Sequence, residues 1–536
     1  MKCPSPSPLV AVRGVKVLLP PPGEVGELFR FIDLAAGYGV NTLMIELGGA
    51  MEYKSHPEVN EGWIEYAAEM GEYPGKGAEF QTHTEKNLGW HRNSIHSDNG
   101  GGLVVPQAEI RAILDYCEGR GVEVIPEVPS LSHSDYLLTR HPELAERAGD
   151  PHPDAYCPSN PATYELLFDI LGEVVSLFRP RVVNIGHDEL YTACLCPRCK
   201  GRGAPELYAA DIVRIRDFLA SKGVRTMIWA EKLLDAHFID SGSPCGGAGS
   251  ATIPELYPCR DLLPDDILML HWYWSLDRRF DQTYVERGFP FAFGNFSGRG
   301  MVAWKERSKA PGFFGYMISN WGRTDMPTVQ RNGILADLAY DALMEASPDP
   351  DAERPELWGQ MFRSLFERRL AASPAGARHL FIRHATSVRM DYRYFVDGFY
   401  IKDETYRLGE YRVRLADGSE VVAPVLYGLN ISNDSLPWER PRPYDTDAAD
   451  GNQALAEVAY STLPVRLGDR TEYIMAIDLP AGAEVSSVTF LPAPGREGAV
   501  RYEVLPLPED EDRWAAGIQD AACEVARFAP ANDGEG

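Results

Sequence analysis

The sequence predicts an α/β fold: a (β/α)8 TIM barrel followed by a helical segment and a small C-terminal antiparallel β-sandwich. Between about residues 10 and 345, short apolar runs alternate with longer stretches of helical periodicity, the pattern of βα units around a parallel sheet. Several of these runs are apolar at nearly every position, as expected for strands buried on both faces. After about residue 405 the pattern changes to short alternating strands separated by turn dipeptides.

Eight apolar runs are the expected barrel strands. In chain order they are Gly14–Leu19, Thr42–Leu47, Val122–Val128, Arg181–Gly186, Arg225–Ala230, Ile267–Trp272, Phe289–Gly294 and Gly315–Trp321. Helical stretches such as Gln107–Gly119 and Ala162–Phe178 lie between them. Eight strands in about 330 residues fit a barrel with insertions. A doubly wound open sheet is the alternative, but no glycine-rich phosphate loop follows the first run.

The chain divides into four expected segments. They are the barrel (8–346), a helical connecting segment (356–404), the β-sandwich (405–510) and a partly flexible tail (511–536). The Pro/Asp-rich stretch 347–355 is the expected linker after the barrel. A long excursion at 53–105 follows the second strand. Loops of this length on a barrel either shape the active site or are mobile, and both interpretations stay open.

The charge balance of the chain argues against nucleic acid as a partner. The 536 residues include 52 basic and 78 acidic side chains, for a formal net charge of −26 at pH 7. Such a charge repels phosphate backbones, and no basic stripe offsets it locally. No apolar run approaches the roughly 20 residues that a membrane span needs, so we expect no membrane partner. A homo-oligomer is compatible with this composition.

The cysteine content and the opening residues predict a cytoplasmic protein. The nine cysteines are odd in number and unevenly spaced, which favours reduced thiols over a disulfide scaffold. The opening MKCPSPSPLVAVRG contains three prolines and no continuous apolar core, so it does not resemble a secretory signal.

Polar and aromatic side chains follow the expected strands, where the active site of a (β/α)8 barrel is built. Asp188 and Glu189 come directly after the fourth run. The other side chains at these ends are Glu46, Glu127, His133, His187, Trp229, Glu231, His271, Trp272, Tyr273, Trp274, Asn295, Asn320, Trp321 and Asp325. Indole rings stack on the apolar faces of sugars, and carboxyl groups supply the proton transfers of glycoside cleavage. The pattern indicates a site for a small glycoside or glycan fragment.

Each of these residues also has a structural interpretation. An Asp-Glu pair at a strand end, taken alone, is more often a solvated turn or a helix N-cap than a catalytic pair. His133 and His187 are also compatible with a structural role, and tryptophans are more common in cores than in sugar pockets. Position at the strand ends favours the functional interpretation.

Motifs in the right order resemble glycoside hydrolase family 20. The segment VVNIGHDEL (182–190) resembles the fourth-strand signature of that family, in which an Asp-Glu pair follows a short apolar strand and a glycine. VNTLMIELGGAMEY (40–53) and VIPEVPSLSH (124–133) resemble its second- and third-strand segments. MIWAEKLLD, HWYWSLD and GYMISNW take the places of its Trp-bearing fifth, sixth and eighth strands. Glu46, the GFP at 288–290 and the strand-eight NWGR are most similar to the hexosaminidase D-like branch.

The resemblance implies an exo-acting, retaining β-N-acetylhexosaminidase that removes terminal GlcNAc or GalNAc. In this family the 2-acetamido oxygen of the substrate attacks the anomeric carbon and forms an oxazolinium intermediate. By that resemblance, Asp188 orients the acetamido N–H, Glu189 is the general acid and then the base, and catalysis requires no cofactor. Two adjacent carboxyl groups in one apolar mouth tend to separate their pKa values, which suits this division of roles. The implied substrate contacts are Glu46, His133, His187, Trp229, Trp272, Tyr273, Trp274, Asn295 and Trp321.

The sequence also departs from the family pattern. The first-strand arginine that grips sugar hydroxyls in many members has no counterpart, because the corresponding region is Leu18-Leu19-Pro20-Pro21. Tyr273 is the nearest candidate for the tyrosine behind the acetamido group, with Trp274 as the alternative.

A cysteine cluster follows the fourth run directly. Cys194, Cys196 and Cys199 have C-x-C-x-x-C spacing, compact enough to share a structural zinc ion. Cys157, in the preceding loop, is the candidate fourth ligand. The alternative is a set of reduced cysteines in a loop.

Two further functions compete with the hydrolase. One is a metal-dependent barrel hydrolase that uses His133, His187, Asp188 and Glu189 as ligands. The other is a non-catalytic glycan-binding protein, which the missing arginine would favour and the intact carboxyl pair opposes.

Overall fold

The computed structural model describes residues 11–70, 98–150, 153–239, 246–250, 253–301, 304–347, 355–390, 406–435 and 451–505. The chain forms two compact units. The first holds the described residues up to Phe296 together with Trp304–Met326. The second holds 297–301 and the described residues from Pro327 onward. Most of the predicted excursion, most of the linker and the whole predicted tail lie outside the described residues.

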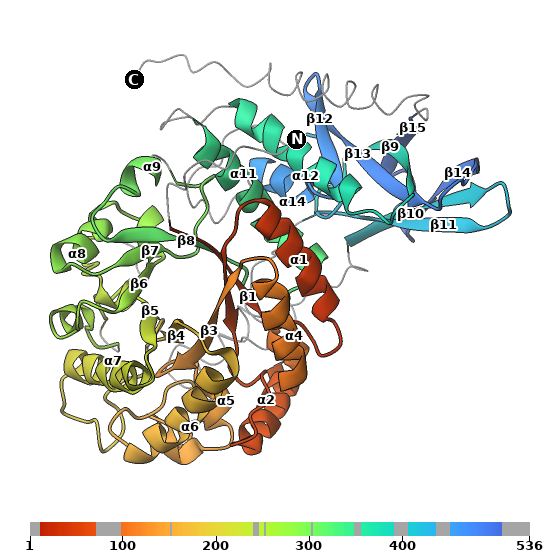
Figure 1. Ribbon diagram of the computed structural model, residues 1–536. Helices are drawn as coiled ribbons and strands as arrows, with labels where there is room; N and C mark the ends of the chain where they lie inside the picture. Colours follow the sequence, from red (N-terminus) through yellow and green to blue (C-terminus); the bar gives the residue numbers. More distant parts are fainter. Residues whose placement is uncertain are drawn as a thin grey trace, which may run out of the picture. The chain divides into compact units, whose positions relative to one another are not determined.

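The first unit is a closed barrel of eight parallel strands, which confirms the predicted fold (Figure 1). Consecutive strands pair in sequence order, and β8 returns to pair with β1. The strands are β1 (Val12–Leu18), β2 (Thr42–Glu46), β3 (Glu123–Ser130), β4 (Val182–Gly186), β5 (Arg225–Trp229), β6 (Leu268–His271), β7 (Phe291–Phe293) and β8 (Phe313–Ser319). Helices surround this ring of strands on the outside.

The helices of this unit follow the apolar periodicity of the sequence. They are α1 (Val25–Gly37), α2 (Pro57–Met70), α4 (Gln107–Glu118), α5 (Asp135–Leu138), α6 (Pro161–Phe178), α7 (Ala204–Ser221), α8 (Arg279–Arg287) and α9 (Trp304–Arg307). Short 3-10 turns complete the connections: η1 (Asn99–Gly102), η2 (Pro142–Leu144), η3 (Glu231–Leu233), η4 (Tyr257–Asp261) and η5 (Tyr273–Ser275). The ends of helix α6 are set by residues typical of helix termini. The Asn160 side chain caps its first turn, and Pro161 has a φ angle already suited to the start of a helix. Arg179, in a left-handed conformation, ends the helix.

Inward side chains of the strands fill the barrel interior. The buried cluster comprises Met44, Ile125, Met227, Trp229, Leu268, Leu270, Trp272, Ala292, Met317 and Trp321. Gly14 of β1 is required here, because a Cβ at that position would lie 2.5 Å from the sulfur of Met317. The interior is therefore packed with side chains, and only the carboxyl ends of the strands are free to form a site.

The second unit contains two antiparallel sheets, which confirms the sheet type predicted for this part of the chain. One has the strand order β11-β10-β14 and the other β12-β13-β9-β15. Their strands are β9 (Arg378–Thr386), β10 (Arg407–Leu415), β11 (Glu420–Leu426), β12 (Thr462–Leu467), β13 (Arg470–Leu479), β14 (Val485–Pro492) and β15 (Val500–Val504). The sheets face each other: the buried Tyr411 of β10 contacts Tyr502 of β15, and its hydroxyl lies 3.0 Å from Nδ1 of His384 on β9.

The prediction of a continuous helical segment over 356–404 is wrong. Helix α12 runs from Pro355 to Ala371 and stops before Pro374, which cannot continue a helix. Residues 378–386 then form β9, which pairs with both β13 and β15 inside the four-stranded sheet. The strand RHLFIRHAT contains only a short apolar run at 380–382, and periodicity alone does not separate a short apolar run of a strand from a helix. Residues 391–404 lie outside the described residues.

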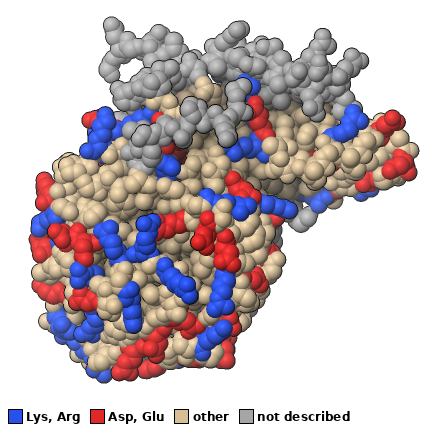
Figure 2. Space-filling view, in the orientation of Figure 1, with Lys and Arg blue, Asp and Glu red and all other residues tan. Residues whose placement is uncertain are grey.

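The remaining helices among the described residues are α10 (Met326–Arg331), α11 (Ile334–Ala346) and α14 (Gly451–Val458). No helix among the described residues is long and apolar enough to span a membrane. On the barrel face shown in Figure 2, basic and acidic side chains are interspersed.

Candidate active site

The predicted Asp-Glu pair lies directly after β4, in a strained stretch of backbone. His187 and Glu189 have positive φ angles of 70° and 52°. His133 after β3 and Asn295 after β7 do so as well, at 50° and 46°. Each such residue costs roughly 1–2 kcal/mol relative to a relaxed conformation. Strain of this kind persists only where surrounding contacts enforce it, and it concentrates at functional sites.

Three side chains enforce the backbone of the segment 187–189. The Tyr208 hydroxyl on α7 donates to the carbonyl of residue 187 at 2.6 Å. The Ser132 hydroxyl donates to the carbonyl of residue 188. The carboxyl group of Glu231 in η3 accepts the N–H of residue 189 at 2.7 Å. Contacts from three separate elements therefore fix the direction in which the two carboxyl side chains point.

His133 joins the two carboxyl groups of the pair. Its Nε2 lies 3.3 Å from Oδ2 of Asp188 and 3.6 Å from Oε2 of Glu189. Burial by itself lowers the pKa of His133, but the adjacent Asp188 and Glu189 carboxylates outweigh it and hold that pKa well above its ordinary value. The imidazole is therefore cationic at neutral pH. The Asp188 side chain is 5% exposed and that of Glu189 is 30% exposed, so only the second acid reaches solvent readily.

A second group of charges lies at the ends of β1, β2 and β3. Nζ of the fully buried Lys16 is 2.7 Å from Oε2 of Glu46 and 3.9 Å from Oε2 of Glu127. Burial raises the pKa of Glu127 to about 7, with Lys16 opposing the rise and Glu46 and Asp188 adding to it. Glu127 also accepts a 2.6 Å hydrogen bond from the indole N–H of Trp229. This acid is thus half protonated near neutral pH.

Three tryptophans form a contiguous aromatic group beside these acids. Trp229 stacks on Trp272 at 5.0 Å between ring centroids, and Trp321 contacts both. The Trp321 indole donates to Oδ1 of Asn295 at 2.9 Å, and Lys16 lies 3.3 Å from the centre of its ring. Trp272 and Trp321 retain 9% and 7% exposure, whereas Trp229 is fully buried and supports the other two.

Two predicted substrate contacts lie away from this cluster. His187 is fully buried, with Nε2 at 2.8 Å from Oδ2 of Asp211 and Nδ1 at 3.1 Å from the Ser130 hydroxyl. Its side chain is directed to Asp211 of α7 and away from the strand ends. Trp274 is buried and donates to the carbonyl of Gly294 at 2.7 Å. Tyr273 is partly buried and packs against the tryptophan group, so it is the better placed of the two alternatives considered for the acetamido-backing position.

Lys16, Glu231 and Tyr191 were missed as site residues by the sequence interpretation. Lys16 was visible as a lone charge within the apolar run of β1. Glu231 was noted at a strand end without a role, and its burial raises its pKa to about 8 despite the opposing Lys232. Tyr191 lies two residues after Glu189, its ring 4.3 Å from Nζ of Lys232. No spacing rule in the sequence indicates that contact.

The structure brings together most of the predicted cysteine cluster. Sγ of Cys157 lies 3.2 Å from that of Cys196 and 3.5 Å from that of Cys199. Burial raises the pKa of both Cys157 and Cys199, that of Cys199 to about 12. The fourth member of the compact group is Glu146 and not the predicted Cys194, whose sulfur instead lies 3.6 Å from the carbonyl of Arg202.

The chain is similar to several known proteins. A Beta-hexosaminidase of Akkermansia muciniphila is 25% identical over 224 residues, covering 38% of this chain and 41% of the relative. A Beta-hexosaminidase of Vibrio furnissii is 27% identical over 224 residues, covering 38% of this chain and 34% of the relative. This chain therefore spans less than half the length of either curated relative. The solved β-N-acetylhexosaminidase of Bacteroides fragilis has a TM-score of 0.46 and 17% identity, covering 68% of this chain and 71% of that one.

The family assignment rests on the barrel. Residues 24–279 match the model of the glycosyl hydrolase family 20 catalytic domain. The match includes the strand ends that carry Glu46, His133, Asp188 and Glu189. The narrower hexosaminidase D-like branch stays a prediction. Residues 24–279 therefore carry the catalytic domain of glycosyl hydrolase family 20.

Proposed function

We propose that this protein is an exo-acting, retaining β-N-acetylhexosaminidase that removes terminal GlcNAc or GalNAc by substrate-assisted catalysis. The observation that carries the proposal is the unequal environment of the two adjacent acids. Asp188 is buried against a cationic His133, and Glu189 reaches solvent from the same strand end. A fixed anion and an accessible proton carrier are what the two roles in this reaction require.

In the first step Asp188 accepts the acetamido N–H of the substrate. This contact turns the acetamido oxygen toward the anomeric carbon, where it forms a new C–O bond as the glycosidic C–O bond breaks. Glu189 gives its proton to the departing oxygen, and the sugar is left as an oxazolinium ion. The imidazolium of His133, within 3.3 Å of Asp188, stabilises the anionic carboxylate throughout.

In the second step Glu189 takes a proton from water, and the water oxygen attacks the anomeric carbon. The oxazolinium ring opens, and the acetamido group is restored with retained configuration. The exposure of the Glu189 side chain allows that water to enter. The exposure that Trp272 and Trp321 retain, 9% and 7%, supports a role for these rings in stacking against the sugar.

Glu189→Gln tests the acid/base role directly. General acid–base catalysis contributes roughly 10²–10⁴-fold, so we expect a loss of that size in kcat/KM on an aryl N-acetyl-β-glucosaminide and on the galactosaminide. An aryl leaving group of low pKa, such as dinitrophenol, needs little protonation, so the loss on that substrate should be much smaller. Glu118→Gln makes the same chemical change at an exposed position of α4 and should leave the rates unchanged.

Substrates with an altered acetamido group test substrate assistance. Replacing the N-acetyl group by N-trifluoroacetyl weakens the attacking oxygen and should slow the wild-type enzyme strongly. Cleavage of aryl glucosides that lack the acetamido group, at rates matching the N-acetyl substrates, would show the mechanism to be wrong. Tight binding of GlcNAc with no turnover of any aryl glycoside would instead favour the non-catalytic glycan-binding alternative.

The metal-dependent alternative loses one of its four ligands. His133, Asp188 and Glu189 lie close enough to share an ion, but His187 is directed to Asp211 instead.

A further inference from the structure

A buried group of three thiols and one carboxyl lies outside the reaction site. It consists of Cys157, Cys196, Cys199 and Glu146, and one possible ligand atom from each falls within 4.8 Å of the others. All four residues are buried, with Glu146 and Cys199 at 1% and 0% exposure. With zinc–sulfur bonds of about 2.3 Å, tetrahedral geometry places sulfur atoms roughly 3.8 Å apart. The observed sulfur separations of 3.2 and 3.5 Å need only small side-chain adjustments to reach that value.

The backbone brings these residues together from two barrel connections. Between β3 and α6, Ala145 and Tyr156 form an isolated antiparallel bridge that sets Glu146 beside Cys157. Between β4 and α7, the N–H groups of Cys199 and Lys200 both donate to the carbonyl of Cys196, which closes a tight turn around the C-x-x-C pair. Both connections begin at strand ends that carry reaction-site residues.

Glu146 completes the group. Its Oε1 accepts the N–H groups of Leu195 at 2.7 Å and Cys196 at 3.2 Å. Its Oε2 is buried and has no hydrogen-bond partner among the described residues. A buried carboxyl oxygen without a partner is unfavourable, so the site contains an acceptor that a cation would satisfy.

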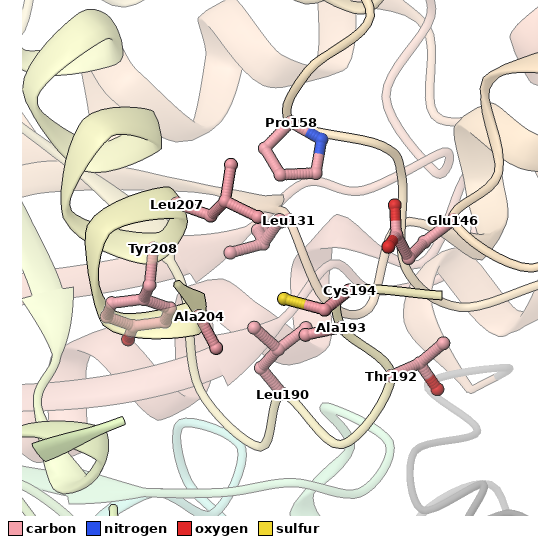
Figure 3. A pocket seen from close by; sticks show the side chains of 10 residues that line it. All are labelled: Leu131, Glu146, Pro158, Leu190, Thr192, Ala193, Cys194, Ala204, Leu207 and Tyr208. Carbon is pink, nitrogen blue, oxygen red and sulfur yellow. The ribbon is translucent and has the colours of Figure 1, made fainter. Parts of the chain in front are cut away.

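Cys194 packs against this cluster but is not among the four residues whose possible ligand atoms lie together. It lines a pocket with Glu146 and Leu207, and Figure 3 shows its sulfur pointing to the side opposite Glu146. This arrangement makes Cys194 a natural control for the assignment of the other cysteines.

We propose that Cys157, Cys196, Cys199 and Glu146 bind one structural zinc ion. Thiolates select soft or borderline cations, and a closed set of four protein ligands is typical of zinc sites with a structural role. On binding, the thiols release their protons to solvent and their sulfurs bond to the metal. The ion joins the two connections, one bearing His133 and the other Asp188 and Glu189, and so braces the reaction site from behind.

Metal content of the full-length protein tests the proposal. We expect one zinc per chain by plasma mass spectrometry after purification under reducing conditions and dialysis. Replacement by Co²⁺ should give sulfur-to-cobalt charge-transfer bands and the intense visible bands of tetrahedral cobalt. Cys196→Ser should abolish stoichiometric metal, and Glu146→Gln should weaken zinc affinity at least tenfold against a competing chelator. Cys194→Ser, the same change two residues away, should retain the metal and the cobalt spectrum.

Several outcomes would overturn the proposal. Wild-type protein from zinc-supplemented cells without bound metal would do so without any variant. So would an intact mass two hydrogens lighter than the reduced chain, with the disulfide mapped to Cys157 and Cys196. Loss of metal in Cys194→Ser together with full retention in Glu146→Gln would refute Glu146 as the fourth ligand. None of these readouts depends on glycosidase activity.

Discussion

Replacing Glu231 by glutamine tests whether this side chain is buried as a protonated acid or as a charged carboxylate. This carboxyl is fully buried and accepts the N–H of Glu189, yet burial raises its pKa to about 8. The folded protein therefore keeps Glu231 protonated at neutral pH, and glutamine has nearly the same shape with no proton to lose. The amide oxygen of Gln can still accept the Glu189 N–H.

The size of the effect follows from the pKa. An ordinary value of 4.5 raised to about 8 corresponds to about 5 kcal/mol, at roughly 1.4 kcal/mol per pH unit. The folded state binds this proton more tightly than the unfolded chain does, so wild-type stability should fall as pH rises from about 4.5 to about 8. Coupling to Asp188 and Glu189 shares part of that energy, so a relative change of a few kcal/mol is the expected measurement.

Urea unfolding at pH 5, 7 and 9 tests this reasoning. Compared with wild type, Glu231→Gln should be close in stability at pH 5 and clearly more stable at pH 9. Glu118→Gln, at an exposed position, should follow the wild-type curve throughout. Parallel curves for wild type and Glu231→Gln would mean that Glu231 is ionised over the whole range, which would refute the assignment.

Measurements of kcat and KM test whether Glu231 positions Glu189 or contributes only to the stability of the fold. Glu231→Gln should keep kcat within a few-fold of wild type, since the Glu189 N–H retains its acceptor. Glu231→Ala removes that acceptor and should lower kcat more than it raises KM. Equal kcat values for the two variants would rule out a positioning role.

Two other substitutions probe the interior of the mouth. Lys16→Met leaves Glu46 and Glu127 buried without their cation, which should lower the free energy of unfolding in urea by roughly 3–5 kcal/mol. The double variant Lys16→Met/Glu46→Gln should recover part of that loss. No recovery would show that the ion pair is not the cause. Trp229→Phe removes the 2.6 Å hydrogen bond to Glu127 and should lower the free energy of unfolding by about 1–3 kcal/mol with little change in KM. Trp321→Phe should instead raise KM with a smaller loss of stability. Equal effects of the two variants on KM would place Trp229 in contact with the sugar.

The barrel was predictable because its strands carry their own signal. Runs such as Thr42–Glu46 are buried at every position, and continuous burial produces continuous hydrophobicity. The carboxyl ends of such strands meet at one face of a barrel, so Asp188 and His133 could be placed in one site from order alone. The strand Arg378–Thr386 shows the limit, because its apolar run at 380–382 is too short to distinguish a strand from the continuation of the preceding helix.

Side-chain direction was not predictable in the same way. His187 and Glu189 are two residues apart with similar backbone angles, yet one ring is directed to Asp211 and the other side chain to the mouth. The difference depends on partners such as Asp211 of α7, which are distant in sequence. Glu146 entered the cysteine group for the same reason, since only the bridge between Ala145 and Tyr156 places it beside Cys157.

The charges of the mouth explain why one acid can act as a proton carrier among many. Lys16 lies beside Glu46, His133 beside Asp188, and Lys232 lies 3.7 Å from Glu231. Lys16 and Lys232 each lie beside a buried acid that does not exchange protons with the substrate in the proposed mechanism, and His133 lies between Asp188 and Glu189.

Burial distinguishes the acids that hold protons at neutral pH from the acid that reaches solvent. Glu127 and Glu231 are enclosed and hold protons to about pH 7 and about pH 8, so neither adds a full negative charge at neutral pH. Glu189, at 30% exposure, is the acid of this group with ready access to water and to a leaving oxygen. The strained backbone and the buried, protonated acids at this strand end therefore accompany the one acid, Glu189, that acts first as an acid and then as a base in the proposed mechanism.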